Sequence, residues 1–213
     1  MKVLVYVPLH PDYGIRKKSL ESVMALEWGT RLSIIFGRSA KARPDGHLDL
    51  CNKLQEARHI VLDCNYDALL VVEADMVVPR TALIRLSSLD GDVVYGLYCS
   101  RRGEHPWLVF TDVDEQEGSI LEKKYRPLYF GSAIDSCGVG MGCTLIRRSA
   151  LLDVPFRTQN GGQAPDWWFA LDCKEMGMHQ ISDMGTVCGH YLNENEIIYP
   201  DPTQISLYRT EVE

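Results

Sequence analysis

Continuous apolar runs, rather than alternating ones, most strongly constrain how this chain folds. Val3–Leu9, Leu32–Phe36 and Ala68–Val72 are runs of this kind, and strands buried on both faces of a parallel sheet have this composition. Two stretches with helical composition or spacing, Tyr13–Leu26 and Leu50–Cys64, separate them. The first half therefore predicts strand–helix–strand units with a parallel sheet, as in α/β domains.

The first half ends with a short helix after Pro79 and a further strand, Asp92–Tyr98. The second half of the chain has a different pattern. There we expect a short helix over Ser149–Val154 and an amphipathic helix over Asp166–Met176 that ends at Gly177. Short strand-like pieces lie around these helices. They are Trp107–Phe110, Ser119–Leu121, Pro127–Phe130, Cys143–Ile146, His179–Ser182 and Thr186–His190. This pattern predicts a mixed sheet in the second half.

The length of the chain bounds its domain organisation. A chain of 213 residues can bury one substantial core. The sequence has no internal repeat and no linker long enough to separate two domains. We therefore expect a single α/β domain over residues 1–213, with the last residues, 193–213, forming a tail.

The charge distribution argues against a nucleic-acid-binding protein. The formal net charge is −7, and the basic residues occur as isolated pairs, whereas a duplex-binding protein concentrates positive charge on one face. No segment approaches the roughly 20 apolar residues of a transmembrane helix, so we expect none. The seven cysteines include no C-x-x-C pair, and their odd number suits a reducing compartment. We therefore expect a cytoplasmic protein.

Two acidic residues directly follow the run Ala68–Val72. Residues two apart on a strand point to the same side, so Glu73 and Asp75 converge if the strand geometry continues. They stand at the carboxyl end of a predicted parallel strand, where open α/β sheets bind ligands. Close carboxylates repel one another unless a cation lies beside them, and oxygen ligands suit Mg²⁺ or Mn²⁺. The sequence favours a metal site here over the alternative, a solvated acidic turn.

A second acidic position precedes three aromatic residues. Asp166 begins a predicted helix, where capping and the helix dipole alone favour an acid. However, Trp167, Trp168 and Phe169 follow it, and three consecutive aromatic side chains cannot all face a core from one helix. At least one of them should line a surface or cleft, where an aromatic face can hold the apolar side of a sugar.

A glycine cluster and a late histidine complete the candidate features. Gly138–Gly142 opens onto a strand rather than a helix, so it is not a dinucleotide-binding loop. It instead lets the backbone approach a ligand or another segment closely. His190 ends a predicted strand beside Gly189, although a lone histidine is more often structural than a ligand.

In order and spacing, these pieces resemble the GT-A type of nucleotide-sugar glycosyltransferase, close to the large family of inverting enzymes. Asp67–Pro79 resembles the family's strand ending in a D-x-D motif, with Glu73 in place of the first acid. The segment starting at Asp166 is similar to the family's E-D-x-x-F segment, with Pro165 in place of the Glu. Further matching segments are Asp92–Tyr98 with Arg101-Arg102, Gly138–Arg148 and Gly189-His190. In their order and spacing, all these pieces together span more than half of the chain.

The resemblance implies a Rossmann-like domain in which residues 1–100 bind the donor and residues 101–192 face the acceptor. The donor would be a nucleoside diphosphate sugar, and UDP-sugar is favoured because it is common among similar proteins. Mn²⁺ or Mg²⁺ on Asp75, helped by Glu73 and His190, would stabilise charge on the leaving diphosphate. Asp166 would act as the general base on an acceptor hydroxyl, and direct attack would invert the anomeric centre.

The same resemblance assigns residues to the two sides of the site. Those expected at the donor are Pro8, Leu9, Arg58, Glu73, Ala74 and Asp75. Those expected on the acceptor side are Gly140, Met141, Gly142, Trp167 and Trp168. For Arg58, and for Lys53 as a second candidate phosphate contact, a solvated helix face is the alternative.

Two other function classes stay open. A sugar-1-phosphate nucleotidyltransferase also has metal-binding carboxylates on an α/β sheet, but it usually carries a Gly-rich basic loop after the first strand, where this chain has Leu9–Gly14. A non-catalytic carbohydrate-binding or structural descendant of the fold is the second alternative, because Glu73 and Pro165 depart from the family pattern.

Overall fold

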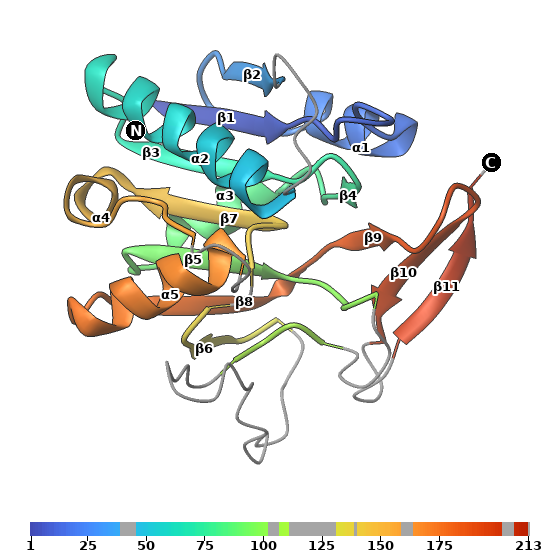
Figure 1. Cartoon of the computed structure of the whole chain (residues 1–213). Helices are drawn as coiled ribbons and strands as arrows, with labels where there is room; N and C mark the ends of the chain where they lie inside the picture. Colours follow the sequence, from blue (N-terminus) through green and yellow to red (C-terminus); the bar gives the residue numbers. More distant parts are fainter. Residues whose placement is uncertain are drawn as a thin grey trace.

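Two sheets organise the part of the chain that the computed structural model describes, residues 1–38, 46–101, 107–110, 131–138, 140–158, 164–201 and 207–212. The larger sheet has seven strands in the order β2-β1-β3-β7-β5-β8-β6 (Figure 1). Its strands are β1 (Val3–Pro8), β2 (Ser33–Gly37), β3 (Ala68–Val72), β5 (Val93–Leu97), β6 (Ala133–Asp135), β7 (Cys143–Arg147) and β8 (Gln180–Val187). The smaller sheet has the order β11-β10-β9-β4. Its strands are β4 (Met76–Val77), β9 (Gly189–Tyr191), β10 (Glu196–Pro200) and β11 (Leu207–Glu211).

The first three strands of the large sheet form its parallel half. β2 pairs with one side of β1 and β3 pairs with the other, both in parallel. Every residue of β1 and β3 is buried, which confirms the expectation drawn from their continuous apolar runs. After β1 the chain therefore forms β2 on one side of β1 and then crosses to form β3 on the other side. The carboxyl ends of β1 and β3 flank this switch point, where open α/β sheets bind ligands.

The remaining strands make the sheet mixed, as predicted. β7 runs antiparallel to both β3 and β5, β8 is parallel to β5, and β6 is antiparallel to β8. The expected strands His179–Ser182 and Thr186–His190 are instead one strand, β8, with a register shift at Gly96/Leu97 of β5, followed by β9. The expected strand Trp107–Phe110 is not formed as a strand in the described residues: Trp107 makes an isolated β-bridge to Cys99, and residues 108–110 have no regular secondary structure. The expected strands over residues 119–121 and 127–130 lie outside the described residues.

Five helices of the described residues pack around the large sheet. They are α1 (Lys17–Met24), α2 (Gly46–Asp63), α3 (Ala82–Ser88), α4 (Arg148–Asp153) and α5 (Pro165–Glu175). Helix α2 packs against α4 and α5 on one face, and α3 packs against β5, β7 and β8 on the other (Figure 1). Helix α1 is shorter than the expected Tyr13–Leu26, because a turn closed between His10 and Gly14 occupies the start of that segment.

The small sheet stands beyond the carboxyl ends of β1 and β3 (Figure 1). The chain joins it to the large sheet at two places, from β3 to β4 and from β8 to β9, and β4 pairs antiparallel with β9. The residues from 193 onward, which we expected to form a tail, contain β10 and β11, an antiparallel pair that continues from β9. The expectation of a tail is therefore corrected.

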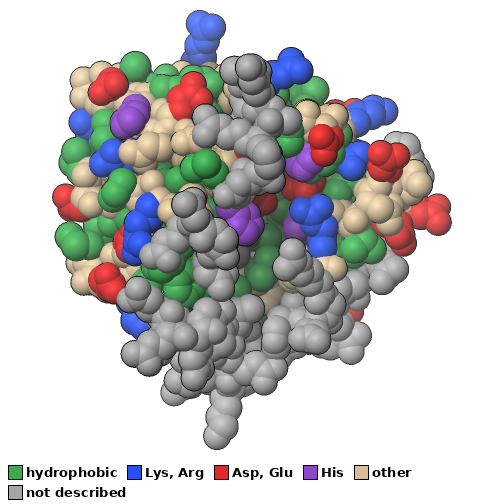
Figure 2. Space-filling view, in the orientation of Figure 1, with side chains coloured by type: hydrophobic (Ala, Val, Ile, Leu, Met, Phe, Trp, Pro, Cys, Tyr) green, Lys and Arg blue, Asp and Glu red, His purple; other side chains and the backbone are tan. Residues whose placement is uncertain are grey.

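The visible surface carries mixed charge. On the face in Figure 2, Lys and Arg side chains of the described residues alternate with Asp and Glu side chains, in keeping with the net charge of −7. In the described part of the chain, no helix combines the length and apolarity needed to cross a membrane.

Candidate active site

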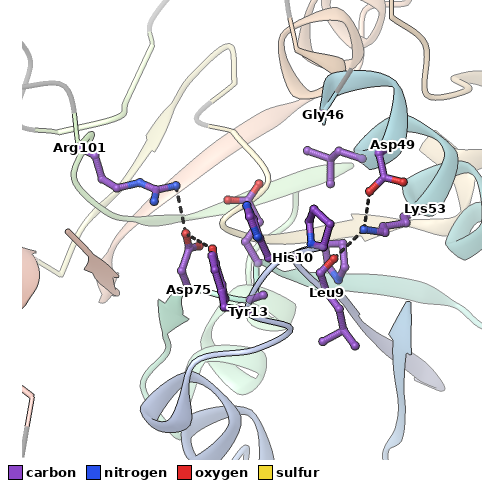
Figure 3. A pocket seen from close by; sticks show the side chains of 13 residues that line it. Leu9, His10, Tyr13, Gly46, Asp49, Lys53, Asp75 and Arg101 are labelled. Carbon is purple, nitrogen blue, oxygen red and sulfur yellow. Dashed lines mark hydrogen bonds and ion pairs between the residues drawn. The ribbon is translucent and has the colours of Figure 1, made fainter. Parts of the chain in front are cut away.

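A pocket of about 210 Å³ opens at the carboxyl ends of β1 and β3, at the switch point of the sheet (Figure 3). Its lining comes from four places in the chain: the end of β1 and the loop after it, the first half of α2, the residues after β3, and Arg101. The lining residues are Pro8, Leu9, His10, Pro11, Tyr13, Gly46, Asp49, Leu50, Lys53, Glu73, Ala74, Asp75 and Arg101. The predicted donor residues other than Arg58 are thus brought together.

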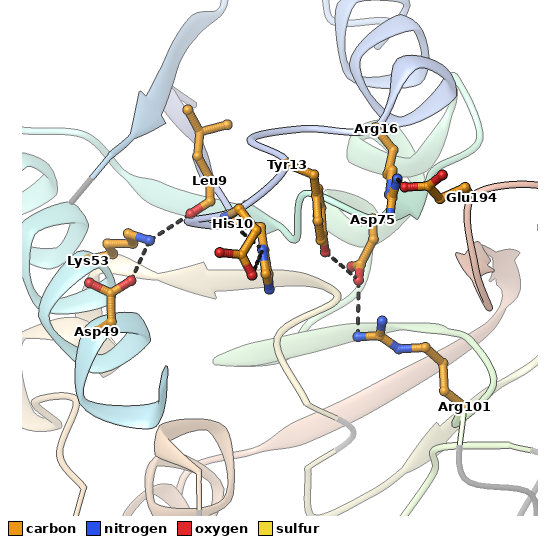
Figure 4. A network of polar contacts seen from close by, with 10 residues as sticks. Leu9, His10, Tyr13, Arg16, Asp49, Lys53, Asp75, Arg101 and Glu194 are labelled. Atoms are coloured by element: carbon orange, nitrogen blue, oxygen red, sulfur yellow. Dashed lines mark hydrogen bonds and ion pairs between the residues drawn. The ribbon is translucent and has the colours of Figure 1, made fainter. Parts of the chain in front are cut away.

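Asp75 is the centre of a polar network in this pocket (Figure 4). Its Oδ2 lies 3.0 Å from a guanidinium nitrogen of Arg101, accepts a 3.1 Å hydrogen bond from the Tyr13 hydroxyl, and lies 3.8 Å from Nε2 of His190. Burial raises the pKa of Asp75, but partners that include the charge of Arg101 and the hydrogen bond from the Tyr13 hydroxyl outweigh burial and hold the pKa below its ordinary value. Asp75 is therefore an ionised carboxylate, although only 5% of its surface is exposed.

His190 faces Asp75 because two short strands pair. In the antiparallel β4–β9 pair, Met76 lies opposite His190, and the Tyr191 N–H donates to the Asp75 carbonyl at 3.0 Å. Nδ1 of His190 lies 2.8 Å from the Cys99 carbonyl oxygen, which only accepts, so Nδ1 carries the proton. Nε2 is buried and has no hydrogen-bond partner among the described residues. It is therefore the ring nitrogen available to a ligand.

The pKa of Glu73 is shifted in the opposite direction from that of Asp75. Burial, the charge of Asp75 and the charge of Asp166 raise the pKa of Glu73 to about 8, although Arg101 opposes them. Glu73 is therefore protonated at neutral pH when no cation is bound. A neutral carboxyl group is a hydrogen-bond donor as well as an acceptor, and this separates its role from that of Asp75.

The loop after β1 builds an aromatic stack at the edge of the pocket (Figure 4). His10 and Gly14 exchange two backbone hydrogen bonds of 2.8 and 2.9 Å, and Gly14 has a φ of 69°, which favours glycine. The rings of His10 and Tyr13 stack with centroids 4.0 Å apart, and the Arg16 guanidinium lies 4.1 Å from the Tyr13 centroid. This stack fixes the Tyr13 hydroxyl beside Asp75.

Helix α2 supplies a cation to the pocket, and it is Lys53, the second candidate, rather than Arg58. Nζ of Lys53 donates to the Leu9 carbonyl and to Asp49 Oδ2, both at 2.6 Å. Arg58 instead donates from Nε to the Leu151 carbonyl at 2.6 Å, and thus ties α2 to α4. The expected phosphate contact of Arg58 is corrected to this structural contact, and Lys53 is the α2 cation that lines the pocket.

Asp166 lies in the first turn of α5, against the glycine cluster. Its Oδ1 accepts a 2.9 Å hydrogen bond from the Trp167 N–H. Gly140 has a φ of 101°, and a Cβ there would lie 3.1 Å from Asp166 Oδ2 and would overlap the Tyr98 hydroxyl. Burial raises the pKa of Asp166, although the hydrogen bond from the Trp167 N–H opposes it. A carboxylate with a raised pKa is a better proton acceptor near neutral pH.

Tyr98 connects the glycine cluster to His190. Its hydroxyl accepts a 3.3 Å hydrogen bond from the Gly142 N–H, and a Cβ at Gly142 would overlap its ring. The same ring meets the imidazole of His190 edge-on, with centroids 5.7 Å apart. Of the two alternatives for the glycine cluster, close approach to another segment is therefore the one observed.

The aromatic residues of α5 divide between core and surface. Phe169 is fully buried, Trp168 is 4% exposed and lies under the Arg157 guanidinium at 4.0 Å, and Trp167 is half-buried. The argument that all three cannot face the core is confirmed. Trp168 and Met141, which is 1% exposed, are buried side chains, so of the two tryptophans expected on the acceptor side Trp167 is the more accessible.

Sequence reasoning missed three residues that the fold brings to the site. Tyr13 and Arg101 contact Asp75 directly, and Tyr98 packs on His190. The position of Tyr13 just after the first strand was the available signal, because that strand end was already expected to border a ligand. Nothing in the sequence pairs Arg101 with Asp75.

The Asp75–His190 pair fits a divalent cation. A buried carboxylate oxygen and an unpartnered imidazole nitrogen face one another, and a backbone carbonyl holds the second ring nitrogen, as is usual for histidine ligands. Within the described ranges no group of three or more His, Cys, Asp or Glu side chains is placed to hold a metal. Mg²⁺-type sites commonly combine one or two carboxylates with substrate phosphates and water, so a two-residue pair suits a phosphate-containing ligand.

No protein-family model matches the chain, and no curated protein matches it significantly. Among solved structures, the crystal structure of A197 from STIV is similar over 97% of this chain and 93% of that chain, with a TM-score of 0.61 and 16% sequence identity. This likeness shows a shared fold.

Structural neighbours of the chain also include glycosyltransferases. S. aureus TarS, crystallised as residues 1–349 in complex with UDP-GlcNAc, matches 85% of this chain with 12% identity and a TM-score of 0.48. A glycosyltransferase involved in the glycosylation of the major capsid of PBCV-1 matches 71% with 14% identity and a TM-score of 0.38. The matches cover 56% of the TarS chain and 63% of the PBCV-1 chain.

Proposed function

We propose that this protein is a metal-dependent glycosyltransferase that moves a sugar from a nucleoside diphosphate sugar to an acceptor hydroxyl, with inversion. The observation that carries the proposal is the Asp75–His190 pair at the switch point of the sheet, in which Nε2 of His190 is buried and has no hydrogen-bond partner in the described part of the chain. The TarS and PBCV-1 likenesses are too slight to carry it, so the proposal rests on the residues of this chain.

In this proposal the pocket binds the nucleoside diphosphate part of the donor. Its volume of about 210 Å³ is below the roughly 300–1,000 Å³ typical of sites that enclose a drug-sized ligand, so it suits one part of a larger molecule. Lys53, in an ion pair with Asp49, and Arg101 line it, and we assign a ribose hydroxyl to Glu73 as its hydrogen-bond partner. UDP is the nucleotide we favour.

Mn²⁺ or Mg²⁺ would be held by Asp75 and His190, and it would supply Lewis-acid stabilisation of the charge on the leaving diphosphate. The chain itself prepares this position in two ways. The Cys99 carbonyl fixes the tautomer of His190, and the Tyr98 ring packs against its imidazole. Both contacts hold Nε2 toward Asp75.

Asp166 would accept the proton of the acceptor hydroxyl. Gly140 lies against both Asp166 and Tyr98, and the Tyr98 ring packs on His190, so the Asp166 carboxylate lies near the Asp75–His190 pair. The Trp167 N–H orients one of its oxygens, and Gly140 adds no side chain over the other. Half-buried Trp167, on the same turn, is positioned to border the acceptor.

The experiment that tests the proposal is nucleotide release from purified protein. A panel of UDP- and GDP-sugars is incubated with Mn²⁺, with Mg²⁺, and with excess chelator, and the free nucleoside diphosphate is measured with and without hydroxyl acceptors. The proposal expects release from one donor, dependent on metal, with an inverted anomeric configuration in the product.

Two outcomes would replace the proposal by its alternatives. Pyrophosphate release from a nucleoside triphosphate and a sugar 1-phosphate would assign a nucleotidyltransferase. Donor binding without any hydrolysis or transfer would assign a non-catalytic descendant of the fold. Full transfer in excess chelator would mean that the protein is a transferase whose activity does not need a metal.

A further inference from the structure

We propose that Arg101 holds the cation position on Asp75 while the metal is absent, and that metal binding releases Arg101 to the donor diphosphate. This inference rests on the proposed function. It assigns to Arg101 a positioning role that couples the binding of the two ligands, and it arises from the way three groups compete for one carboxylate oxygen.

The three groups are Arg101, Tyr13 and His190, and all meet Asp75 at Oδ2. The guanidinium nitrogen is 3.0 Å away, the hydroxyl 3.1 Å and the imidazole Nε2 3.8 Å. A divalent cation bound by Oδ2 and Nε2 adds two positive charges on the oxygen that Arg101 already contacts. Two like charges a few ångströms apart repel strongly where water is partly excluded. Metal and guanidinium are therefore alternative partners of this oxygen.

Arg101 is the partner able to leave. Tyr13 is fixed by its stack with His10 and by the Arg16 guanidinium on its ring. The Arg101 side chain is 47% exposed, whereas that of Asp75 is 7% exposed. Arg101 thus extends from the rim of the pocket onto a buried acid, as Figure 3 shows, and it can turn away without opening the core.

The pocket offers Arg101 a second partner once the donor is bound. Arg101 lines the same pocket as Lys53 and the end of β1, where the proposal places the diphosphate. A guanidinium group donates two parallel hydrogen bonds to phosphate oxygens, and such bidentate contacts are among the strong ones. The metal would thus release Arg101 from Asp75, and Arg101 and the metal would then both bind the donor diphosphate.

The first measurement uses Mn²⁺ alone, without nucleotide. Calorimetric titration compares the wild type with Arg101→Met, which keeps much of the side-chain length and removes the charge. Removing a competing cation should tighten Mn²⁺ binding about 3- to 10-fold, which corresponds to the energy of a partly exposed ion pair. Arg80→Met is the matched control, because Arg80 pairs with Glu27 on the surface and loses the same charge away from Asp75. Its Mn²⁺ affinity should equal that of the wild type.

The second measurement uses UDP at saturating Mn²⁺. Arg101→Met should now bind UDP about 10-fold more weakly, because a bidentate phosphate contact is lost. A general distortion of the pocket would weaken both ligands, and a change in overall charge would also appear in Arg80→Met. Opposite signs for metal and UDP in Arg101→Met alone are therefore specific to the proposal.

Equal Mn²⁺ affinities for the wild type and Arg101→Met, including no binding by either, would overturn the inference, as would weaker Mn²⁺ binding by the variant. Failure of the proposed function looks different. If no donor is turned over but the Mn²⁺ affinities differ as expected, the competition for Asp75 stands without a transferase. If transfer occurs in excess chelator and the affinities are equal, the transferase stands without the competition.

Discussion

The large sheet has a hollow at each end, and the two differ in how their polar groups are satisfied. The hollow at the amino ends of β3 and β5 has a volume of about 640 Å³, against about 210 Å³ for the pocket at the carboxyl ends of β1 and β3. Its lining is also charged. It consists of Met1, Asp67, Asp90, Gly91, Asp92, Arg147, Arg148, Ser149 and His179. By size and charge alone it would be the better candidate site.

Arg148 and His179 of the larger hollow form hydrogen bonds with other elements of the fold. Arg148 donates to the carbonyls of Val61 and Leu62 in the last turn of α2, at 3.1 and 3.0 Å. Both ring nitrogens of His179 have partners, the Asp90 carbonyl and Asp135 Oδ1, each at 2.9 Å. These contacts join elements of the fold and leave their polar groups satisfied.

Beside the smaller pocket lies a buried polar atom that has no hydrogen-bond partner among the described residues. Nε2 of His190 faces Asp75 beyond hydrogen-bond distance, and Asp75 draws two donors and a histidine to one oxygen. A buried group without a partner costs free energy, so its persistence points to a ligand. A buried polar atom without a hydrogen-bond partner, rather than a large volume, therefore distinguishes the candidate site from the structural hollow. Four substitutions test this difference.

The largest effect is expected from Asp166→Asn beside the smaller pocket. Loss of a general base should lower the turnover number about 10²- to 10⁴-fold, while UDP binding in the presence of Mn²⁺ changes little. Steady-state release of nucleoside diphosphate measures this. Asp172→Asn is a control in the same helix, because Asp172 pairs with Arg157 and its loss should affect stability rather than turnover. An unchanged turnover number in Asp166→Asn would remove it from the role of base.

A smaller effect is expected on Mn²⁺ affinity when His190 or His179 is replaced by glutamine in separate variants. His190→Gln should weaken Mn²⁺ binding about 10- to 100-fold, a range already seen when only the outer partners of metal ligands are removed. His179→Gln, in the larger hollow, should leave Mn²⁺ affinity unchanged although His179 also faces an aspartate. Calorimetry measures both. An equal loss of Mn²⁺ affinity in the two variants would contradict the proposed difference between the hollows.

Arg148→Met tests the structural side of the comparison. Two carbonyls at the end of α2 lose their donor, and unsatisfied buried groups of this kind cost about 1–3 kcal/mol. Urea unfolding should report a loss of that size, while UDP affinity with Mn²⁺ stays at the wild-type value. A large loss of UDP affinity at unchanged stability would mean that this hollow, too, binds a ligand.

The smallest effect is expected from the pH dependence of His179. Its hydrogen bond to Asp135 is the main cause that raises its pKa above the ordinary value. A raised folded-state pKa gives stability that is fully present below the unfolded value of about 6.5, and that is lost as pH rises through the folded value. The wild type should therefore melt about 1–3 °C above His179→Gln at acidic pH. Thermal unfolding should show this difference shrinking as pH rises, and a constant difference would contradict it.

Much of the fold followed from local patterns in the sequence. The continuous runs in β1 and β3 predicted buried parallel strands, and the position of Asp75 after β3 placed it at the edge where ligands bind. Short elements escaped prediction because their pairing depends on distant partners. β4 has two residues and exists through its pairing with β9, so no periodicity could reveal it, and yet this pairing brings His190 to Asp75.

The strand geometry on which the convergence of Glu73 and Asp75 depended does not continue: β3 ends at Val72, and the Met76 N–H donates to the Glu73 carbonyl at 3.1 Å across a turn. The position of the two acids at the edge of the sheet was therefore predictable, and the direction of their side chains was not.

Lys53 and Arg58 are five positions apart on α2 and therefore point in directions about 140° apart, so the sequence could not tell which one reaches the pocket. The glycines Gly140 and Gly142 predicted close approach, but only the fold identifies Tyr98 as the ring they approach. Arg101 reaches Asp75 through tertiary structure alone.

The central claim is that Asp75 makes nucleotide binding depend on a divalent metal. UDP affinity, measured by calorimetry with Mn²⁺ and with excess chelator in the wild type and in Asp75→Asn, tests it most directly. The account predicts that Mn²⁺ tightens UDP binding at least about tenfold in the wild type, since each factor of ten is about 1.4 kcal/mol, and that Asp75→Asn folds but loses this dependence. Equal UDP affinity with and without metal in the wild type, or an Asp75→Asn protein that keeps the full dependence, would contradict it.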